Sequence, residues 1–534
     1  MHTSPDISQG SKSPAFPVRG SSYYREEHKI YLLLSLAGAL FGLISPGFDL
    51  FYLAWFGLVP LLVSTFSAKT IPQAFYRSVF FGYAYNLVYN NFILSFSASV
   101  WPDGLKPYTL IANTVVWLLV ALQQGALYGT FASIIRWLPI TGGFLPVRIQ
   151  DRVRLPGLFI VPLAFVLIMN KLGNSPASVS VPWSLIEYSQ YQQIQLLQIA
   201  GIIGGIGISA LIVMTNMLVA GLIASFCRIS ALSDLAFPDK RSLVGSLIVV
   251  EILFVSIFIY GQDALSKGAR RPLTNRTTIS VLQGNMLFGL NEIDPKKHMD
   301  RYHELAAKSP TGICLWPEWS MPISIGLFPQ AFRSLGDSAR KKGQDWIVGA
   351  MDGKESSGFY NAAISLGISG DYLDNIYRKR YLVPFGEHTP PWLLKSPLGF
   401  ACGTLTPRRE GYIEGNEATV FELKEGKVAP LICCELISPE LTAESVRNGG
   451  QLLVDLSNTM WFQTEQLGDQ SIAVCAMRAV ENHRYFVFGT SIGPSAFIDP
   501  FGRVTKRAPL NTACTLVDDV SFYNDLTPFT RWFR

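Results

Sequence analysis

The sequence predicts a polytopic α-helical membrane domain followed by a layered α/β domain. Up to about residue 262 the chain is a series of long apolar runs, while beyond about residue 275 it has the composition of a globular domain. Charged residues make up 16% of the 534 residues, whereas soluble proteins usually carry about 25%. The low charged content therefore indicates that part of the chain lies in lipid.

Apolar segments of the first half approach the roughly 20 residues that a membrane-spanning helix needs. The seven segments are centred near 30–46, 49–66, 78–98, 110–135, 155–171, 196–226 and 243–262. Pro162 interrupts the short fifth segment, but membrane helices tolerate proline. We therefore expect about seven transmembrane helices at 30–262, after a polar cytoplasmic tail at 1–29 that is too long and too mixed in charge for a cleaved signal peptide.

The loops between the segments predict an orientation. If the N-terminal tail is cytoplasmic, the loops on that side carry a set of basic residues, and the loops on the other side carry only Lys106 and Lys171. The cytoplasmic set is Lys69, Arg77, Arg136, Arg148, Arg152, Arg154, Arg228, Lys240 and Arg241. This bias agrees with the positive-inside rule. Seven crossings then place the C-terminal domain outside, in the periplasm or its equivalent.

Charge and motif content argue against several classes of protein. The net charge of +5 is small for this length, and no basic face is interleaved with aromatic residues, so we expect no nucleic-acid partner. Neither CxxC pairs nor clustered histidines occur, so we expect no metal, and we expect no cofactor. The glycine-rich run at 201–210 lies inside an apolar segment, where small residues let helices pack closely. The seven cysteines leave disulfides open.

From residue 277 onward, β-branched runs alternate with helical patterns, which is typical of a layered α/β domain. After a first run at 277–285, the predicted strands are 312–316, 345–350, 361–367, 372–379, 418–423, 428–433, 451–457, 485–490 and 495–499, and the predicted helices are 294–309, 329–343, 438–448 and 470–483. Cys475 lies on the buried face of the last helix and is interpreted as a core residue. We place this domain at 277–525, between a linker at 263–276 and a tail at 526–534.

Three reactive side chains lie just past the ends of predicted strands, where ligands meet an α/β sheet. They are Glu318, Lys379 and a cysteine of the pair Cys433 and Cys434. Alone, Glu318 and Lys379 would be interpreted as surface residues. Together, the three groups supply covalent acyl transfer: a carboxylate that takes the thiol proton, and an ammonium and a backbone N–H that stabilise the oxyanion. Adjacent side chains at a strand end point to opposite faces, so only one thiol faces the other two groups.

These residues carry a resemblance to a known family. The order glutamate, lysine, cysteine in "LWPEWSMP", "YRKRYLVPFGE" and "ICCE" resembles the nitrilase (carbon-nitrogen hydrolase) superfamily, whose domain is an α-β-β-α sandwich with a Glu-Lys-Cys triad. The stretches "PWSLIEYSQ", "VLQGN", "YNAA", "SNTMWF" and "AFIDPFGRV", behind several spans, resemble one branch of it over nearly the whole chain. That branch is the bacterial apolipoprotein N-acyltransferases.

The resemblance implies a ping-pong reaction at the bacterial cytoplasmic (inner) membrane, with the catalytic domain on the periplasmic side. A thiolate would attack the sn-1 ester of a phospholipid, typically phosphatidylethanolamine, and the thioester would acylate the α-amine of a diacylglyceryl-cysteine at an apolipoprotein N-terminus. Glu318 would be the general base, Lys379 the oxyanion stabiliser and Cys433 the nucleophile. We expect a monomer.

The resemblance also implies supporting residues. Glu387 matches a second carboxylate of the family, Glu435 matches the acidic residue two places after the nucleophile, and Trp461 matches an aromatic residue near the site. Cys434 stands where the family commonly has tyrosine, and its backbone N–H would contribute to the oxyanion site. The chain ends at "DLTPFTRWFR", where the family usually adds a membrane helix, and the linker after the seventh apolar segment has no tryptophan, where the family often has one.

Three apolar stretches, at 319–330, 389–400 and 460–463, are interpreted either as walls of a lipid entrance or as domain core. Within the apolar segments, Glu251 is a functional candidate because a carboxylate there needs a partner or water. Two other functions stay open. A membrane-tethered carbon-nitrogen hydrolase or amidase would pass its acyl group to water, although tethering needs only one span. A non-catalytic lipid-binding homologue would not need the complete triad.

Overall fold

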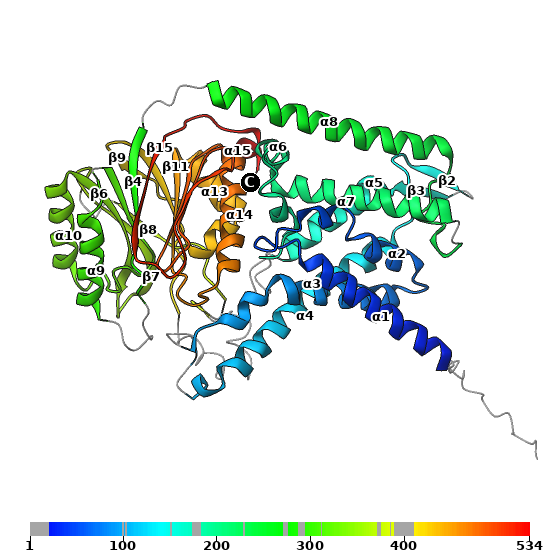
Figure 1. Ribbon diagram of the computed structural model, residues 1–534, viewed down its shortest axis with the longest axis horizontal. Helices are drawn as coiled ribbons and strands as arrows, with labels where there is room; N and C mark the ends of the chain where they lie inside the picture. Colours follow the sequence, from blue (N-terminus) through cyan, green and yellow to red (C-terminus); the bar gives the residue numbers. More distant parts are fainter. Residues whose placement is uncertain are drawn as a thin grey trace, which may run out of the picture.

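The computed structural model describes residues 21–98, 101, 104–149, 152–173, 183–227, 230–270, 276–286, 294–310, 312–370, 375–384, 386–388 and 411–533. Figure 1 shows a helical first half beside a domain of stacked sheets and helices. The long helix α8 (Lys240–Arg270) runs along the helical half and ends close to the first strand of the second domain. The helix therefore continues into the stretch that the sequence assigned to a linker.

Every predicted apolar segment contains helix. The helices are α1 (Ser21–Gly42), α2 (Val59–Ser67), α3 (Ile71–Tyr89), α4 (Thr109–Trp137), α5 (Gly157–Leu167), α6 (Ile194–Leu197), α7 (Ala200–Cys227) and α8. Within the described residues, three stretches are helical, long and apolar enough to cross a membrane: Lys106–Trp137, Ala200–Cys227 and Lys240–Arg270. Shorter apolar helices cover Phe51–Ser67 and Gly157–Asn170. Three candidate spans are thus found, and a count of seven is not confirmed.

Short elements connect these helices. They are the 3-10 helices η1 (Phe51–Trp55), η2 (Asn91–Ser95), η4 (Lys106–Tyr108), η6 (Ile186–Gln190) and η7 (Ser230–Leu232), and a small sheet of β1 (Ile140–Thr141), β2 (Val147–Ile149) and β3 (Arg152–Pro156). Glu251, the functional candidate of the sequence, is exposed on α8. Its exposure places it on the outer surface of the helical domain and not in a polar interior.

Two helices of the membrane domain are irregular. A single π-helical turn, η5 (Ile168–Leu172), continues α5, and such turns are frequent at functional sites. In α7, Gly204 has non-helical backbone angles (φ 70°, ψ 172°). A Cβ atom there would lie 2.6 Å from the Phe529 ring, so both the angles and the space require glycine. The predicted close packing at the glycine run is confirmed, but the run also interrupts the helix.

The second domain contains two six-stranded sheets, with strand orders β15-β4-β5-β6-β7-β8 and β14-β13-β12-β11-β10-β9. The first has β4 (Arg276–Gln283), β5 (Gly312–Trp316), β6 (Gln344–Lys354), β7 (Gly358–Gly367), β8 (Ile376–Arg378) and β15 (Cys514–Ser521). The second has β9 (Phe421–Leu423), β10 (Gly426–Ile432), β11 (Leu452–Ser457), β12 (Phe486–Thr490), β13 (Ala496–Ile498) and β14 (Val504–Arg507). Strands β4, β5 and β6 are parallel, as are β10, β11 and β12.

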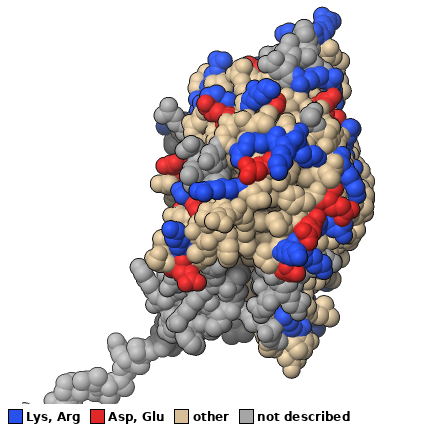
Figure 2. Space-filling model, turned by 90° about the vertical axis from the view of Figure 1, so that its left-hand side faces the viewer, with Lys and Arg blue, Asp and Glu red and all other residues tan. Residues whose placement is uncertain are grey.

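Helices cover the outer faces of both sheets. Helices α9 (Pro295–Ala307) and α10 (Pro329–Lys342) lie on the first sheet, and α13 (Pro439–Arg447) and α14 (Glu465–Asn482) lie on the second (Figure 1). The α-β-β-α layering is thus confirmed. Between the sheets, a core forms from apolar side chains such as Ile279, Val281, Ile432, Val454 and Val487. On the face around α9 and α10, basic and acidic side chains are interspersed (Figure 2).

Helix α14 belongs to the interiors of both domains. One apolar cluster includes its Ala473 and Met477 together with Ile208 and Met217 of α7. Cys475 is fully buried, which confirms its interpretation as a core residue. The helix starts at Glu465, five residues before the predicted 470. The short helix α15 (Pro528–Trp532) contacts α7 and α13, so the predicted tail is partly structured.

Candidate active site

Strand ends bring the predicted triad together. Glu318 follows β5, Lys379 follows β8 and Cys433 follows β10, so all three lie at the same end of their strands. The side chains of Glu318 and Lys379 are buried, with 6% and 1% of their surface exposed. The interpretation of each residue, taken alone, as a surface residue is therefore wrong. Cys433 is partly exposed. The nucleophile candidate is thus the accessible member of a buried group.

One amide links the two acidic residues of the site. Asn361 on β7 donates from Nδ2 to Glu318 Oε1 at 2.6 Å and to Glu387 Oε1 at 2.8 Å. The Lys379 ammonium lies 2.8 Å from Glu387 Oε2 and 3.5 Å from Glu318 Oε1. The backbone N–H of Asn458 donates to Glu318 Oε2 at 2.7 Å. Glu318 is therefore held by three donors, and the closer ionic partner of Lys379 is Glu387.

Burial and neighbouring charges set the protonation states. Burial raises the pKa of Glu318, and Lys379 opposes that rise. Burial opposes the charge of Lys379, but Glu387 and the other acidic groups raise its pKa above the ordinary value. For the Cys433 thiol, burial and then Glu318 raise the pKa, while Lys379 lowers it. Cys433 therefore rests as a thiol, and the Glu318 carboxyl group is more basic than an ordinary one.

The backbone at Cys433 is in the left-handed region, with φ 57°. This conformation is uncommon for a residue with a Cβ atom and is often found at active sites. It ends β10 and begins the short 3-10 helix η9 (Cys433–Ile437). Cys434 is 5% exposed, and its Sγ atom lies 3.4 Å from the carbonyl oxygen of Tyr381. The two thiols thus have different environments: one accessible, one packed.

Glu435 connects the strand of the cysteine to the strand of the lysine. Its carboxylate accepts hydrogen bonds from the backbone N–H groups of Ile432 (2.7 Å), Arg380 (2.6 Å) and Tyr381 (3.1 Å). The Tyr377 hydroxyl donates a fourth bond at 2.8 Å. Because Arg380 directly follows Lys379, this fully buried carboxylate fixes Lys379 relative to Cys433.

Aromatic side chains border the site. Trp461 lies after β11, and its ring centre is 6.4 Å from that of Trp319, next to the Glu318 position. Trp319 also contacts Tyr412. The predicted apolar stretch at 319–330 divides: Met321 and Ile325 are core residues, while Leu327 and Phe328 are 45% and 53% exposed. The stretch at 389–400 lies outside the described residues.

Sequence reasoning missed the role of Asn361. The residue lies in "YNAA", one of the stretches that resemble the family, but the sequence alone does not indicate a function for it. Its partners Glu318 and Glu387 are 43 and 26 residues away in sequence, so no local pattern could reveal the bond. Its position within a buried strand was the available signal, because a buried amide needs partners.

Two stacked sheets between helical layers, with glutamate, lysine and cysteine gathered at strand ends, define a carbon-nitrogen hydrolase domain, and the family model of that description matches residues 280–523. A second model, described as the apolipoprotein N-acyltransferase N-terminal domain, matches residues 37–218. Together the two models match most of the chain, and both halves are similar to apolipoprotein N-acyltransferases.

Relatives match over most of the chain. The apolipoprotein N-acyltransferase of Geobacter metallireducens is 27% identical over 527 residues, which cover 94% of this chain and 92% of the relative. That of Gloeobacter violaceus is 25% identical over 505 residues, or 93% and 89% of the two chains. Among solved structures, Saccharomyces cerevisiae Nit3, a nitrilase-superfamily member, is 18% identical with a TM-score of 0.36, covering 47% of this chain and 91% of that one.

Proposed function

We propose that this protein is a phospholipid-dependent N-acyltransferase that completes the acylation of lipoproteins. The observation that carries the proposal is the buried network of Glu318, Lys379, Glu387 and Asn361 beside the accessible Cys433. The names of the relatives support the reaction class. The apolar helices of the first half support a substrate taken from lipid.

The first half-reaction forms a thioester. Glu318 takes the proton of the Cys433 thiol, and the thiolate attacks the carbonyl carbon of a phospholipid ester, typically at sn-1 of phosphatidylethanolamine. The Lys379 ammonium and the Cys434 N–H stabilise the oxyanion that forms. The intermediate then collapses, the C–O bond breaks, and the leaving lysophospholipid oxygen takes the proton from Glu318.

The second half-reaction transfers the acyl group to nitrogen. The neutral α-amine of a diacylglyceryl-cysteine attacks the thioester carbon, and Glu318 accepts a proton from that nitrogen. The C–S bond breaks, an amide forms, and the proton passes from Glu318 to the thiolate. The same carboxyl group is therefore base and acid in turn, and Glu387 keeps Lys379 beside it in both steps.

We further propose about seven membrane crossings, which place the catalytic domain on the periplasmic side of the inner membrane. The basic residues of the loops support this orientation. The exposed Leu327 and Phe328 and the aromatic pair Trp319 and Trp461 would line the path of the acyl chain. Bromine on lipid chains should therefore quench fluorescence from Trp319, and unchanged fluorescence in a chain with Trp319 as its sole tryptophan would contradict this path.

The decisive experiment traps the thioester. The purified protein is mixed with phospholipid carrying a labelled sn-1 chain, without acceptor, and labelled protein is measured before and after hydroxylamine. We expect hydroxylamine-sensitive label on the wild type and on Cys434→Ala, and none on Cys433→Ala. Label lost from Cys434→Ala but kept by Cys433→Ala would reverse the assignment of the nucleophile.

Adding a diacylated lipopeptide identifies the reaction. We expect the label to move to the peptide amine, with at least a 1,000-fold loss of this transfer in Cys433→Ala, because the nucleophile is indispensable (roughly 10⁶-fold in a comparable covalent enzyme). Release of the label as free fatty acid, with none on the peptide, would identify a hydrolase. No trapped thioester and no transfer would identify a lipid-binding homologue.

A further inference from the structure

A second group of buried ionisable residues lies where the catalytic domain meets the membrane domain. We call it the junction cluster: Glu187 of η6, Ser209 of α7, and Arg478 and Glu481 of α14. Each is at most 2% exposed. The proposed reaction uses none of them. A buried group of this kind in a membrane protein calls for a physical account of its charge.

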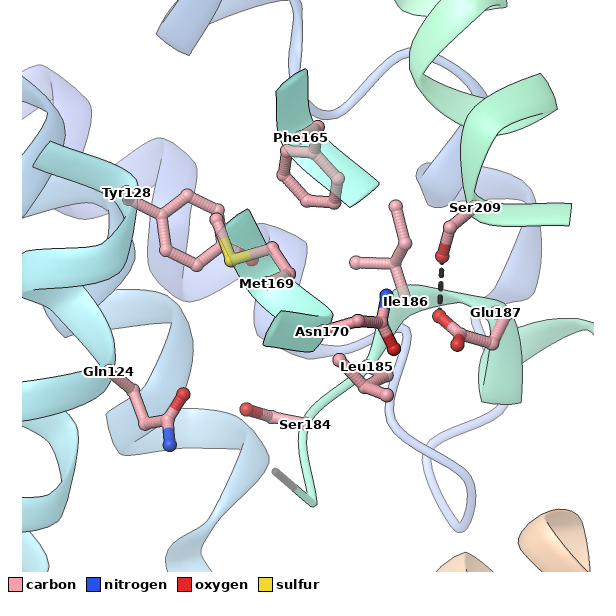
Figure 3. A pocket seen from close by; sticks show the side chains of 10 residues that line it. All are labelled: Gln124, Tyr128, Phe165, Met169, Asn170, Ser184, Leu185, Ile186, Glu187 and Ser209. Atoms are coloured by element: carbon pink, nitrogen blue, oxygen red, sulfur yellow. Dashed lines mark hydrogen bonds between the residues drawn. The ribbon is translucent and has the colours of Figure 1, made fainter. Parts of the chain in front are cut away.

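Two cavities adjoin at this cluster and share Asn170, Leu185 and Glu187 in their walls. The first cavity lies between α4, the end of α5 and α7. Figure 3 shows the Asn170 amide and the Glu187 carboxyl group facing this cavity, and the Ser209 hydroxyl donates a hydrogen bond to Glu187. The second continues to Arg478 and Glu481. Glu187 therefore lies between the first cavity, in the membrane domain, and the Arg478–Glu481 ion pair of the catalytic domain.

Both irregular helices lie at these cavities. The π turn η5 supplies Asn170, and the interruption at Gly204 is followed by Gly205, whose N–H donates to Glu481 Oε1 at 2.8 Å. Non-helical backbone at membrane depth is tolerated where it lines a cavity, and broken helices often bind ions there. The backbone is thus arranged around the junction cluster.

The charges of the cluster do not balance. Arg478 Nη1 lies 2.9 Å from Glu481 Oε2, and its Nη2 donates to the Tyr188 hydroxyl at 3.4 Å. Glu187 receives the Ser209 hydroxyl but forms no ion pair with a described residue. Two carboxyl groups therefore face one guanidinium. An uncompensated buried carboxylate would cost several kcal/mol.

Polar atoms of the cluster also lack hydrogen bonds. Within the described part of the chain, Arg478 Nε has no hydrogen-bond partner, Glu481 Oε2 has only its ionic contact with Arg478 Nη1, and both residues line the second cavity. Burial raises the pKa of Glu481 to about 7 even beside Arg478, and burial also raises the pKa of Glu187. Two ionised carboxylates at neutral pH would therefore carry a large desolvation cost at this site.

We propose that Glu187 holds one positive charge at this junction, as a bound proton or a monovalent metal ion, and that this charge stabilises the packing of the catalytic domain against the membrane domain. Glu187 is assigned this charge because Glu481 already has Arg478 and the Gly205 N–H as partners. The proposal is independent of the acyl-transfer function.

Groups from several elements face this charge. They are Tyr85 and Tyr89 of α3, Tyr128 of α4, Tyr188 of η6, and Arg478 and Glu481 of α14, while Glu440 of α13 faces Arg478. The tyrosines stay neutral over the useful pH range. A carboxyl group whose pKa is raised on folding favours the folded state at low pH, and this stabilisation is lost as pH rises through the folded-state pKa. Stability should therefore decrease toward alkaline pH.

The test measures thermal unfolding of the full chain in lipid nanodiscs from about pH 6 to about pH 9, in sodium, potassium or choline chloride at equal ionic strength. The variant is Glu187→Gln, which keeps the shape and an acceptor for Ser209. The control is Glu251→Gln, which removes an exposed carboxylate from α8. Difference infrared spectra between wild type and E187Q report a protonated carboxyl group directly.

A bound proton predicts that the wild-type Tm falls by a few degrees as pH rises, equally in all three salts, and that E187Q falls less. It also predicts a carboxylic acid band that E187Q lacks. A bound metal ion predicts a higher wild-type Tm in sodium or potassium than in choline, a difference that E187Q loses. Under the proton assignment, Ser209→Ala should move the decline to higher pH, because the Ser209 hydrogen bond lowers the pKa of Glu187.

Two results would overturn the proposal. One is that E187Q fails to fold, or unfolds well below the wild type in every buffer, which would mean that an ionised Glu187 is stabilised by Arg478. The other is that wild type, E187Q and E251Q respond identically to pH and to cations.

Discussion

At the scale of single residues, the site depends on one neutral amide between two carboxylates. Asn361 donates hydrogen bonds from Nδ2 to both Glu318 and Glu387, and the Lys379 ammonium also contacts both carboxylates. Asn361 therefore orients the proposed base, Glu318, without adding a charge. An ammonium in its place would lower the pKa of Glu318 further and weaken it as a base.

We expect Asn361→Ala to shift the acid limb of the pH–rate profile to higher pH. The variant loses a donor that lowers the pKa of Glu318, so the base is protonated at a higher pH than in the wild type. Acyl transfer at neutral pH should fall by roughly 10- to 100-fold, which corresponds to a hydrogen bond to a charged group. Initial rates across pH provide the measurement, and Asn448→Ala, at an exposed position, is the control. A lower rate with an unshifted acid limb would contradict this role.

At the scale of elements, carboxylates hold backbone segments together. Glu435 ties the end of β10 to the segment after β8 through three N–H groups, and Glu481 meets the N–H that follows the break in α7. Both arrangements place a buried charge on backbone donors that have no strand or helix partner. Glu435 therefore helps to position Lys379 through the backbone of the two residues that follow it, Arg380 and Tyr381.

Replacing Glu435 by alanine should both destabilise and inactivate the protein. One buried and two partly buried N–H groups would lose their acceptor, at a cost of about 1–3 kcal/mol for a fully buried group, so we expect the Tm to fall by several degrees. Glu422→Gln, which removes an exposed salt bridge to Lys427, should leave Tm nearly unchanged. Thermal unfolding of the two variants side by side checks this prediction. Equal Tm values would show that the segment after β8 is held by other contacts.

The interruption in α7 gives a second prediction for an element. Gly204→Ala should lower Tm, because alanine at φ 70° is strained and its Cβ would meet Phe529. Strain of this kind costs roughly 1–3 kcal/mol. Gly201→Ala is a matched control three residues earlier, since its nearest neighbour, the Val480 carbonyl oxygen, is at 3.4 Å. Similar unfolding temperatures for both variants would argue that α7 can straighten without cost.

The sequence predicts regular elements better than irregular ones. Buried strands such as β5, β6 and β10 were predicted because β-branched and apolar runs identify them. Strands β14 and β15 were missed, since β14 is exposed throughout and β15 includes Asp518 and Asp519. Pairing with β4 makes β15 a strand, and this tertiary contact leaves no alternating pattern in the sequence.

The candidate site divides in the same way. Glu318, Lys379 and Cys433 were predicted because each follows a strand, and strand ends converge in a layered sheet. Partners recruited through the fold, such as Asn361 and the Asn458 N–H, were not predicted, because their hydrogen bonds join distant segments. Glycine patterns likewise predicted packing at 201–210 but not the backbone angles of Gly204.

At the scale of the whole molecule, the orientation in the membrane can be tested with two native cysteines. Cys227, at the end of α7, is exposed, and Cys514, on β15, is partly exposed. With the other cysteines changed to alanine, we expect an impermeant maleimide to label Cys514 in intact spheroplasts, and Cys227 only after permeabilisation. Labelling of both before permeabilisation, or of Cys227 alone, would contradict a periplasmic catalytic domain.

Helix α14 has a consequence for the biogenesis of this protein. Fifteen of its residues are buried, because the sheet covers one side and the membrane domain covers the other. A fragment beginning at residue 276 would leave side chains such as Met477 without the α7 surface that they pack against. Such a fragment should expose an apolar face and aggregate. The outer face of α14 can therefore be buried only after the preceding helices have been inserted, so membrane insertion precedes the burial of this face.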